Sequence, residues 1–141
     1  MGDSISSQRA PAAVGAYPHA RRHGNLLFLS GLGPRPPGGG PVAGVVLDDE
    51  GEVASYDFAA QVHAVFKNVR IVLEDAGADW SDLLDITVYL IDIKKDFSTF
   101  NHLYADYFDL QGPCRTTVEV NRLPTPIAIE LKCIAALHKT P

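Results

Sequence analysis

The feature that most limits how this chain can fold is an amphipathic segment near its middle. Apolar residues recur there at alternating spacings of four and three, which places them along one side of a helix of about five turns. These residues are Phe58, Val62, Val65, Val69, Val72 and Ala76. Ser55 or Asp57 can cap the start of the helix, and Gly77 suits the position after its end. A helix with one apolar face must pack that face on another element.

Two strands and a long loop are predicted before this helix. The residues from Tyr17 to Ser30 form two short runs around 23–25, and the second run, 26–29, is apolar enough for a buried strand. This pattern predicts a β-hairpin. Residues 33–44 are dominated by proline and glycine, which do not hold a regular element, so we expect a long loop there.

A strand, a second helix and two further strands are predicted after the first helix. β-branched residues alternate with period two over 85–90, which is typical of a strand. After Asp96, apolar and aromatic residues recur with helical spacing as far as Phe108, which predicts a second amphipathic helix. The last strands are expected over 116–120 and 127–134. The order ββαβαββ favours an α+β domain with both helices on one face of a sheet.

Length, charge and cysteine content narrow the class of protein. The chain fits one domain over residues 1–141, of which we expect 1–10 to be flexible. Residues 1–12 lack the apolar stretch of a signal peptide and no apolar run could span a bilayer, so a cytoplasmic protein without membrane contact is expected. The net charge of −5, without a long basic run, argues against nucleic acid as a partner. Cys114 and Cys133 are too few for a disulfide framework, so reduced thiols on strands are favoured.

Both faces of the predicted sheet carry apolar residues. Val118, Val120, Ile129 and Leu131 fall on one face or the other, so neither face is expected to be fully solvated. Association of sheet faces between subunits would cover them, and a homo-oligomer is the economical inference. The alternative is a monomer with a partly polar open face.

Two charged strand residues are the candidates for chemistry. The chain lacks GxSxG, Walker, HExxH and GxGxxG motifs, and its histidines have no metal-ligand spacing, so we predict neither a metal nor a cofactor. Arg115 stands at a predicted strand start, where its guanidinium can bind a carboxylate through two charge-assisted hydrogen bonds. Glu130 interrupts the apolar series between Ile127 and Leu131. On the residues alone, both charges can instead be solvated surface groups.

The C-terminal part of the chain resembles the signature of the Rid/YjgF family. The segment 114–124, continued by Ile129-Glu130, is similar to the family pattern R-[ST]-x-V-x-V-x-x-L-P-x5-E. Further family motifs fall at Gly15-x-Tyr17, Leu29-Ser30-Gly31, Glu74-Asp75-Ala76-Gly77 and Asn101. The resemblance covers residues 10–136. It implies a chorismate-mutase-like fold assembled as a trimer or a dimer of trimers, with active sites in the clefts between subunits.

The resemblance also implies a function and a set of site residues. Members of the family hydrolyse enamine or imine carboxylates to keto acids and ammonia without a cofactor. By resemblance, Arg115 is the clamp for the carboxylate of this small-molecule substrate, and Glu130 exchanges a proton with the attacking water. Thr117 stands where many members have a cysteine whose backbone carbonyl is implicated near the substrate nitrogen. The positions implied to line the pocket are Tyr17, Ser30, Gly31 and Asn101.

Within this family, the segments 30–35, 113–117 and 122–135 look like those of the 2-aminomuconate deaminases. These enzymes convert 2-aminomuconate to 4-oxalocrotonate and ammonium during the degradation of aromatic compounds. Because this substrate has two carboxylates, Arg35 is the candidate for the second contact, with His19 and Arg22 as weaker choices. Arg35 can also be a solvated loop charge. A general imine or enamine acid deaminase, or a non-catalytic ligand-binding member, are the alternative functions.

Overall fold

Helix α1 (Phe58–Asp75) is the element against which the core forms, as the apolar stripe predicts. The computed structural model describes residues 3–137. The Asp57 side chain accepts a hydrogen bond from the N–H of Ala60 and caps the helix start. Gly77 follows the helix end with a φ of +85°, which glycine adopts without strain. All stripe residues except the half-buried Ala76 are buried.

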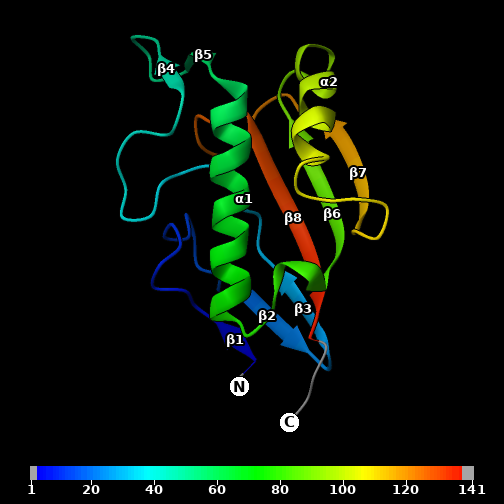
Figure 1. The fold of residues 1–141 in the computed structure, drawn as a ribbon. Helices are drawn as coiled ribbons and strands as arrows, with labels where there is room; N and C mark the ends of the chain where they lie inside the picture. The colour runs from blue at the N-terminus through cyan, green and yellow to red at the C-terminus, as the bar shows by residue number, and fades with distance from the viewer. Residues whose placement is uncertain (1–2, 138–141) are drawn as a thin grey trace.

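A six-stranded sheet lies behind α1 and α2 (Ile93–Tyr104), and both helices cover the same face of it (Figure 1). The strand order is β1-β2-β3-β8-β6-β7. These strands are β1 (Ser4–Ile5), β2 (Ala20–His23), β3 (Leu26–Leu29), β6 (Leu83–Leu90), β7 (Cys114–Glu119) and β8 (Ile129–Ala136). β6 and β7 run parallel, whereas the other neighbours run antiparallel. The predicted α+β fold and the hairpin of β2 and β3 are confirmed.

Part of the segment 1–10, which the sequence predicts to be flexible, contributes to the sheet. Residues 1–2 lie outside the described chain, but β1 pairs with β2, and Ser7 is buried. The Arg9 guanidinium donates to Asp75 at 2.6 Å, and the Ser7 hydroxyl donates to the same carboxylate at 2.5 Å. These contacts attach the segment to the end of α1. A strand of two residues is too short to produce a readable sequence pattern.

Helix α2 begins and ends earlier than the sequence predicts. Asp92 caps it, because the Asp92 side chain accepts a hydrogen bond from the N–H of Lys95. Asp96 is buried within the helix, where its carboxylate accepts a hydrogen bond from the Tyr56 hydroxyl at 2.5 Å. Tyr107 lies beyond the helix end and still packs against the core. The aromatic residues after the helix end lie in a loop that packs against the same core, so their spacing resembles that of the helix.

Strands β4 (Val45–Leu47) and β5 (Val53–Tyr56) form a second, two-stranded sheet. They follow residues 33–44, which hold no helix or strand, as predicted. The two strands are not predicted from the sequence, because β4 is short and an acidic turn separates it from β5. Tyr56 connects this small sheet to α2 through its bond to Asp96.

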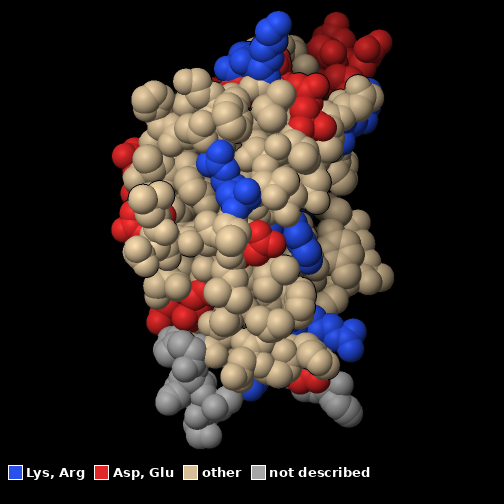
Figure 2. Space-filling model, turned by 90° about the vertical axis from the view of Figure 1, so that its right-hand side faces the viewer, with Lys and Arg blue, Asp and Glu red and all other residues tan. Residues whose placement is uncertain are grey.

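The face of the main sheet opposite the helices is partly apolar. Leu26 and Phe28 on β3 are 38% and 36% exposed, and Val118 on β7 is 36% exposed. Figure 2 shows the side of the molecule on which β7 lies, and uncharged residues cover most of that side. Association of subunits, which the apolar residues of both sheet faces predict, would cover a surface of this kind.

Tyr56→Phe should destabilise the protein, because it leaves the buried Asp96 carboxylate without its donor. An unsatisfied buried acceptor costs about 1–3 kcal/mol, and urea unfolding at a fixed protein concentration should show a loss of that size. Tyr89→Phe is the matched control, because no other residue within 3–137 hydrogen-bonds its hydroxyl. The control should stay within about 0.5 kcal/mol of the wild type. Equal losses in the two variants would contradict the role given to Tyr56.

Candidate active site

Glu130 lies on β8 and points away from the helices. Its neighbours Ile129 and Leu131 are buried in the core, and the alternation of a strand turns Glu130 to the other face. There it lines a small cavity of about 80 Å³. The cavity is lined by Val14, Tyr17, Gly31, Gly33, Arg35, Pro124, Thr125, Ile127 and Glu130. The structure therefore brings together four of the predicted residues: Tyr17, Gly31, Arg35 and Glu130.

The Glu130 carboxylate has no hydrogen-bond or ion-pair partner within residues 3–137. Burial raises the pKa of Glu130 above the usual range of a glutamate, and the positive charge of Arg35 opposes this rise. A half-buried carboxyl that has no hydrogen-bond partner and a raised pKa is suited to accept and return a proton.

Gly31 is required for the position of this carboxylate. A Cβ at Gly31 would overlap the Glu130 side chain, so a larger residue would displace it. Ser30 lies next to the cavity rather than in its wall, and its hydroxyl donates to the Pro18 carbonyl at 2.8 Å. This bond holds the segment that carries Tyr17, whose side chain is exposed at the cavity.

Arg115 lies on β7 and faces α2. Its guanidinium donates to Asn101 Oδ1 at 2.6 Å. It also lies over three aromatic rings of α2, at 4.6 Å from Tyr104, 5.1 Å from Phe100 and 5.8 Å from Phe97. No carboxylate within residues 3–137 forms an ion pair with it. The side chain is therefore held in place while its charge is left free for an anion.

Two hydroxyl groups beside Arg115 are buried without a hydrogen-bond partner in the described chain. They belong to Tyr104 and to Thr117, which stands two residues after Arg115 on the same face of β7. Burial raises the pKa of Tyr104, and the charge of Arg115 opposes this rise. The predicted residues Asn101, Arg115 and Thr117 thus form a second group around the end of α2.

The two groups do not meet within one chain. Arg115 pairs with Ile86 on β6, and Ile86 pairs with Cys133, so Arg115 shares the helix-covered face with these buried residues. Glu130 pairs with Tyr89 on the opposite face. The predicted site is therefore divided into a Glu130 half-site (Tyr17, Gly31, Arg35, Glu130) and an Arg115 half-site (Asn101, Arg115, Thr117).

Several residues of both half-sites are not predicted from the sequence. Thr125 and Ile127 in the turn before β8 line the Glu130 cavity. The three aromatic rings beside Arg115 could have been found from the sequence, because Phe97, Phe100 and Tyr104 recur at spacings of three and four around Asn101. Nothing in the local pattern indicates that the turn residues meet Glu130.

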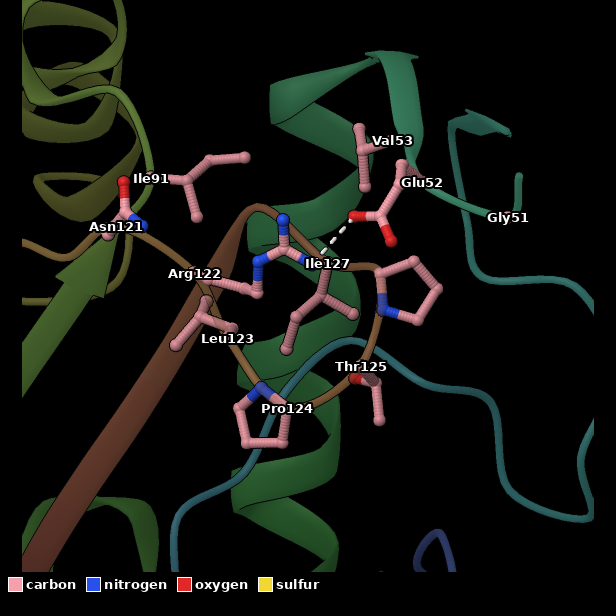
Figure 3. A pocket seen from close by; sticks show the side chains of 11 residues that line it. Gly51, Glu52, Val53, Ile91, Asn121, Arg122, Leu123, Pro124, Thr125 and Ile127 are labelled. Atoms are coloured by element: carbon pink, nitrogen blue, oxygen red, sulfur yellow. Dashed lines mark hydrogen bonds and ion pairs between the residues drawn. The ribbon is translucent and has the colours of Figure 1, made fainter. Parts of the chain in front are cut away.

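A larger hollow of about 290 Å³ lies on the other side of the same turn (Figure 3). Pro124, Thr125 and Ile127 line both hollows, so the turn is the wall between them. Arg122, which lines this outer hollow, is paired with Glu52 at 3.1 Å. Its charge is already matched, which makes it a poorer anion-binding group than Arg115.

Other kinds of site find little support. Within residues 3–137, no three His, Cys, Asp or Glu side chains gather where they could hold a metal ion. Neither helix of the described chain has the length and apolar character needed to cross a membrane. Cys114 and Cys133 are free, as predicted, and burial raises the pKa of the Cys133 thiol to about 12.

Known proteins resemble this chain over nearly its whole length. The profile of the family described as Endoribonuclease L-PSP matches residues 7–137. Reactive Intermediate Deaminase A, chloroplastic, of Arabidopsis thaliana is 38% identical over 133 residues, which cover 94% of this chain and 65% of that protein. A RutC family protein of Pyrococcus abyssi is 36% identical over 131 residues, 93% of this chain and 94% of the relative. The crystal structure of the YjgF gene product from E. coli is 34% identical, with a TM-score of 0.78 over 94% of this chain and 97% of that one. The chain therefore belongs to the Endoribonuclease L-PSP family, the family of the Rid and YjgF proteins.

Proposed function

We propose that the protein is a cytoplasmic hydrolase that deaminates enamine or imine carboxylates and releases a keto acid and ammonia. The observation that carries this proposal is the Glu130 carboxyl, which lies half-buried in a small cavity without a partner in residues 3–137. Such a group suits proton exchange with a bound water. One relative in the family is named a Reactive Intermediate Deaminase, which supports the same activity.

In the proposed reaction, an enamine first gains a proton on carbon and becomes an iminium ion. Water then adds to the carbon that bears the nitrogen, while Glu130 takes a proton from that water. The carbinolamine loses ammonia as its hydroxyl proton leaves, so that iminium and water become keto acid and ammonium. Arg115 would hold the adjacent carboxylate, which orients the reacting carbon toward the water.

We propose that each active site is formed by two subunits of a trimer or of a dimer of trimers. Arg115 and Glu130 lie on opposite faces of one sheet, so a second copy of the chain must supply one of them. The apolar residues Leu26, Phe28 and Val118 on the open face support association through that face. In such a cleft, the Arg115 half-site of one subunit would face the Glu130 half-site of its neighbour.

We propose further that 2-aminomuconate is the substrate and 4-oxalocrotonate the product. This substrate has a carboxylate at each end, and Arg35 lies in the cavity of Glu130. The Arg35 guanidinium donates to the Ala12 carbonyl at 2.6 Å and forms no ion pair within the described chain, so it is free to bind a carboxylate. A general imine deaminase would not use Arg35, and a non-catalytic binding protein would use Arg115 without Glu130.

The proposal is tested by ammonia release from freshly generated 2-aminomuconate and from an aminoacrylate-type imine. Turnover above the spontaneous rate on both substrates is expected, with a preference for the dicarboxylate. Binding of the keto acid product without any turnover would favour the non-catalytic alternative. Cleavage of RNA under the same conditions is not expected, because the net charge is −5 and no long basic run is present.

Arg115→Ala should lower kcat/KM by about 10²- to 10⁴-fold, because it removes two charge-assisted hydrogen bonds to the substrate carboxylate. Arg122→Ala is the matched control, since Arg122 is an exposed arginine that is already paired with Glu52. The control should retain nearly full activity. Near-native turnover by Arg115→Ala would end the clamp assignment.

Mixing Arg115→Ala subunits with Glu130→Gln subunits tests whether the site is shared. After joint refolding at equal amounts, about a quarter of the clefts should contain both native residues, and activity should return to that fraction. A site contained in one chain would regain none, because every chain lacks one of the two groups.

Glu130→Gln should lower kcat with little change in KM, because the amide keeps the shape of the side chain but exchanges no proton. The same variant should unfold at a higher temperature at pH 7. Burial raises the pKa of Glu130 in the folded state, so the charged form opposes folding at neutral pH and not below about pH 4. The stability gain should therefore disappear as the pH falls. Glu50→Gln, an exposed carboxylate, should change neither property.

Arg35→Ala should separate the two candidate substrates. If Arg35 binds the second carboxylate, turnover of 2-aminomuconate should fall about ten- to a hundredfold more than turnover of a monocarboxylate imine. The measurement belongs on the alkaline side of the Glu130 titration, where Glu130 is ionised in both proteins. Equal losses on both substrates would mean that Arg35 shapes its loop rather than reading the dicarboxylate.

A further inference from the structure

Two amide side chains interrupt the apolar face of α1 inside the core. Gln61 is 0% exposed and Asn68 is 2% exposed. They stand seven residues apart, which places both on the same side of the helix. A buried amide is tolerated in a core only when its polar atoms are hydrogen-bonded, so the partners of these two residues determine what they contribute.

Both amides bind loop backbone rather than other side chains. Asn68 Nδ2 donates to the Gly33 carbonyl at 2.9 Å and to the Arg35 carbonyl at 2.7 Å. Gln61 Nε2 donates to the Ala43 carbonyl at 2.8 Å, and its Oε1 accepts from the N–H of Ala128 at 2.8 Å. The helix therefore holds the long loop 33–44 at both of its ends.

These anchored segments form walls of the Glu130 cavity. Gly33 and Arg35 line it directly, and Ala128 lies two residues before Glu130. Asn68 itself does not line the cavity. It can affect Glu130 only through the loop that it holds.

We propose that Asn68 is a positioning residue, which fixes the backbone of residues 33–35 and thereby holds the Arg35 guanidinium beside Glu130. The proposal rests on the proposed function for its catalytic consequence, but the placement of the two charges is a property of the folded protein alone. Gln61 holds the far end of the same loop. Leucine would fill either place in the core but would leave the loop carbonyls without a donor.

Arg35 is the charge near Glu130 whose position depends on this loop. Other titratable groups on the same side include Tyr17, Tyr89, which pairs with Glu130 across the strands, Lys132 and Asp85. The Lys132 ammonium is held independently, because it donates to the Leu29 carbonyl at 2.5 Å. A change at Asn68 should therefore reach Glu130 through Arg35 and not through Lys132.

The test is the titration of the Glu130 carboxyl, followed by carbon-13 NMR in the full-length protein. Because the charge of Arg35 lowers the pKa of Glu130, a loosened loop should raise it. Asn68→Leu should shift the titration to higher pH, in the same direction as Arg35→Met. The double variant should shift no further than Arg35→Met alone, because both changes remove the same interaction.

Val69→Ala is the matched control, since Val69 is fully buried next to Asn68 and touches the core without a loop hydrogen bond. It should lower stability and leave the Glu130 titration where it is in the wild type. If Asn68→Leu does not fold, Asn68→Ser keeps one donor for the two carbonyls and should give a smaller shift in the same direction.

An unchanged titration in folded Asn68 variants, or an additive shift in the double variant, would overturn the proposal. The titration needs no turnover, so it can succeed even if the protein deaminates nothing. In the active enzyme, Asn68→Leu should also reduce the preference for the dicarboxylate by about tenfold, which Val69→Ala should not do.

Discussion

The pairing of β8 with β3 on one side and β6 on the other is the interaction on which the rest of the structure depends. Its register places Ile129 and Leu131 in the core and Glu130 on the open face. Because side chains alternate along a strand, a slip of one residue would put the carboxylate under α1 and both apolar residues in solvent. Burying a charge without a partner costs several kcal/mol, so about this much free energy protects the register. The residues that build the core thereby determine where the candidate catalytic carboxyl points.

Hydrogen bonds from the core to loop backbone complete the surroundings of Glu130. Asn68 and Gln61 hold the loop 33–44, and Ser30 holds the segment that carries Tyr17. Gly31 leaves the space that the carboxylate occupies. Loops on a surface are mobile unless their polar backbone groups are bound, so these few bonds give the cavity its shape. Helix α1 thus has two tasks: its apolar residues cover the sheet, and its amides place the loops.

The separation of Arg115 from Glu130 connects the proposed chemistry to assembly. Arg115 is supported by Asn101 and by the aromatic rings of α2, and its charge faces no carboxylate of the described chain. Glu130 has the complementary surroundings on the other face. A single subunit would therefore contain both half-sites without joining them. A neighbouring subunit that packs on the apolar open face would complete the site.

The sequence by itself determined the helices, the central strands and the family, because apolar periodicity and the motif around Arg115 and Glu130 are local patterns. It did not reveal β1, β4 or β5, because these strands are too short to produce a recognisable sequence pattern. It placed the start of α2 at Asp96, although that residue is buried inside the helix and accepts a hydrogen bond from Tyr56, forty positions away. Only the tertiary structure separated the predicted site residues into two groups on opposite faces of the sheet. The physical reason is that strand register and loop anchoring join residues far apart in the chain, and neither is encoded in the spacing of neighbours.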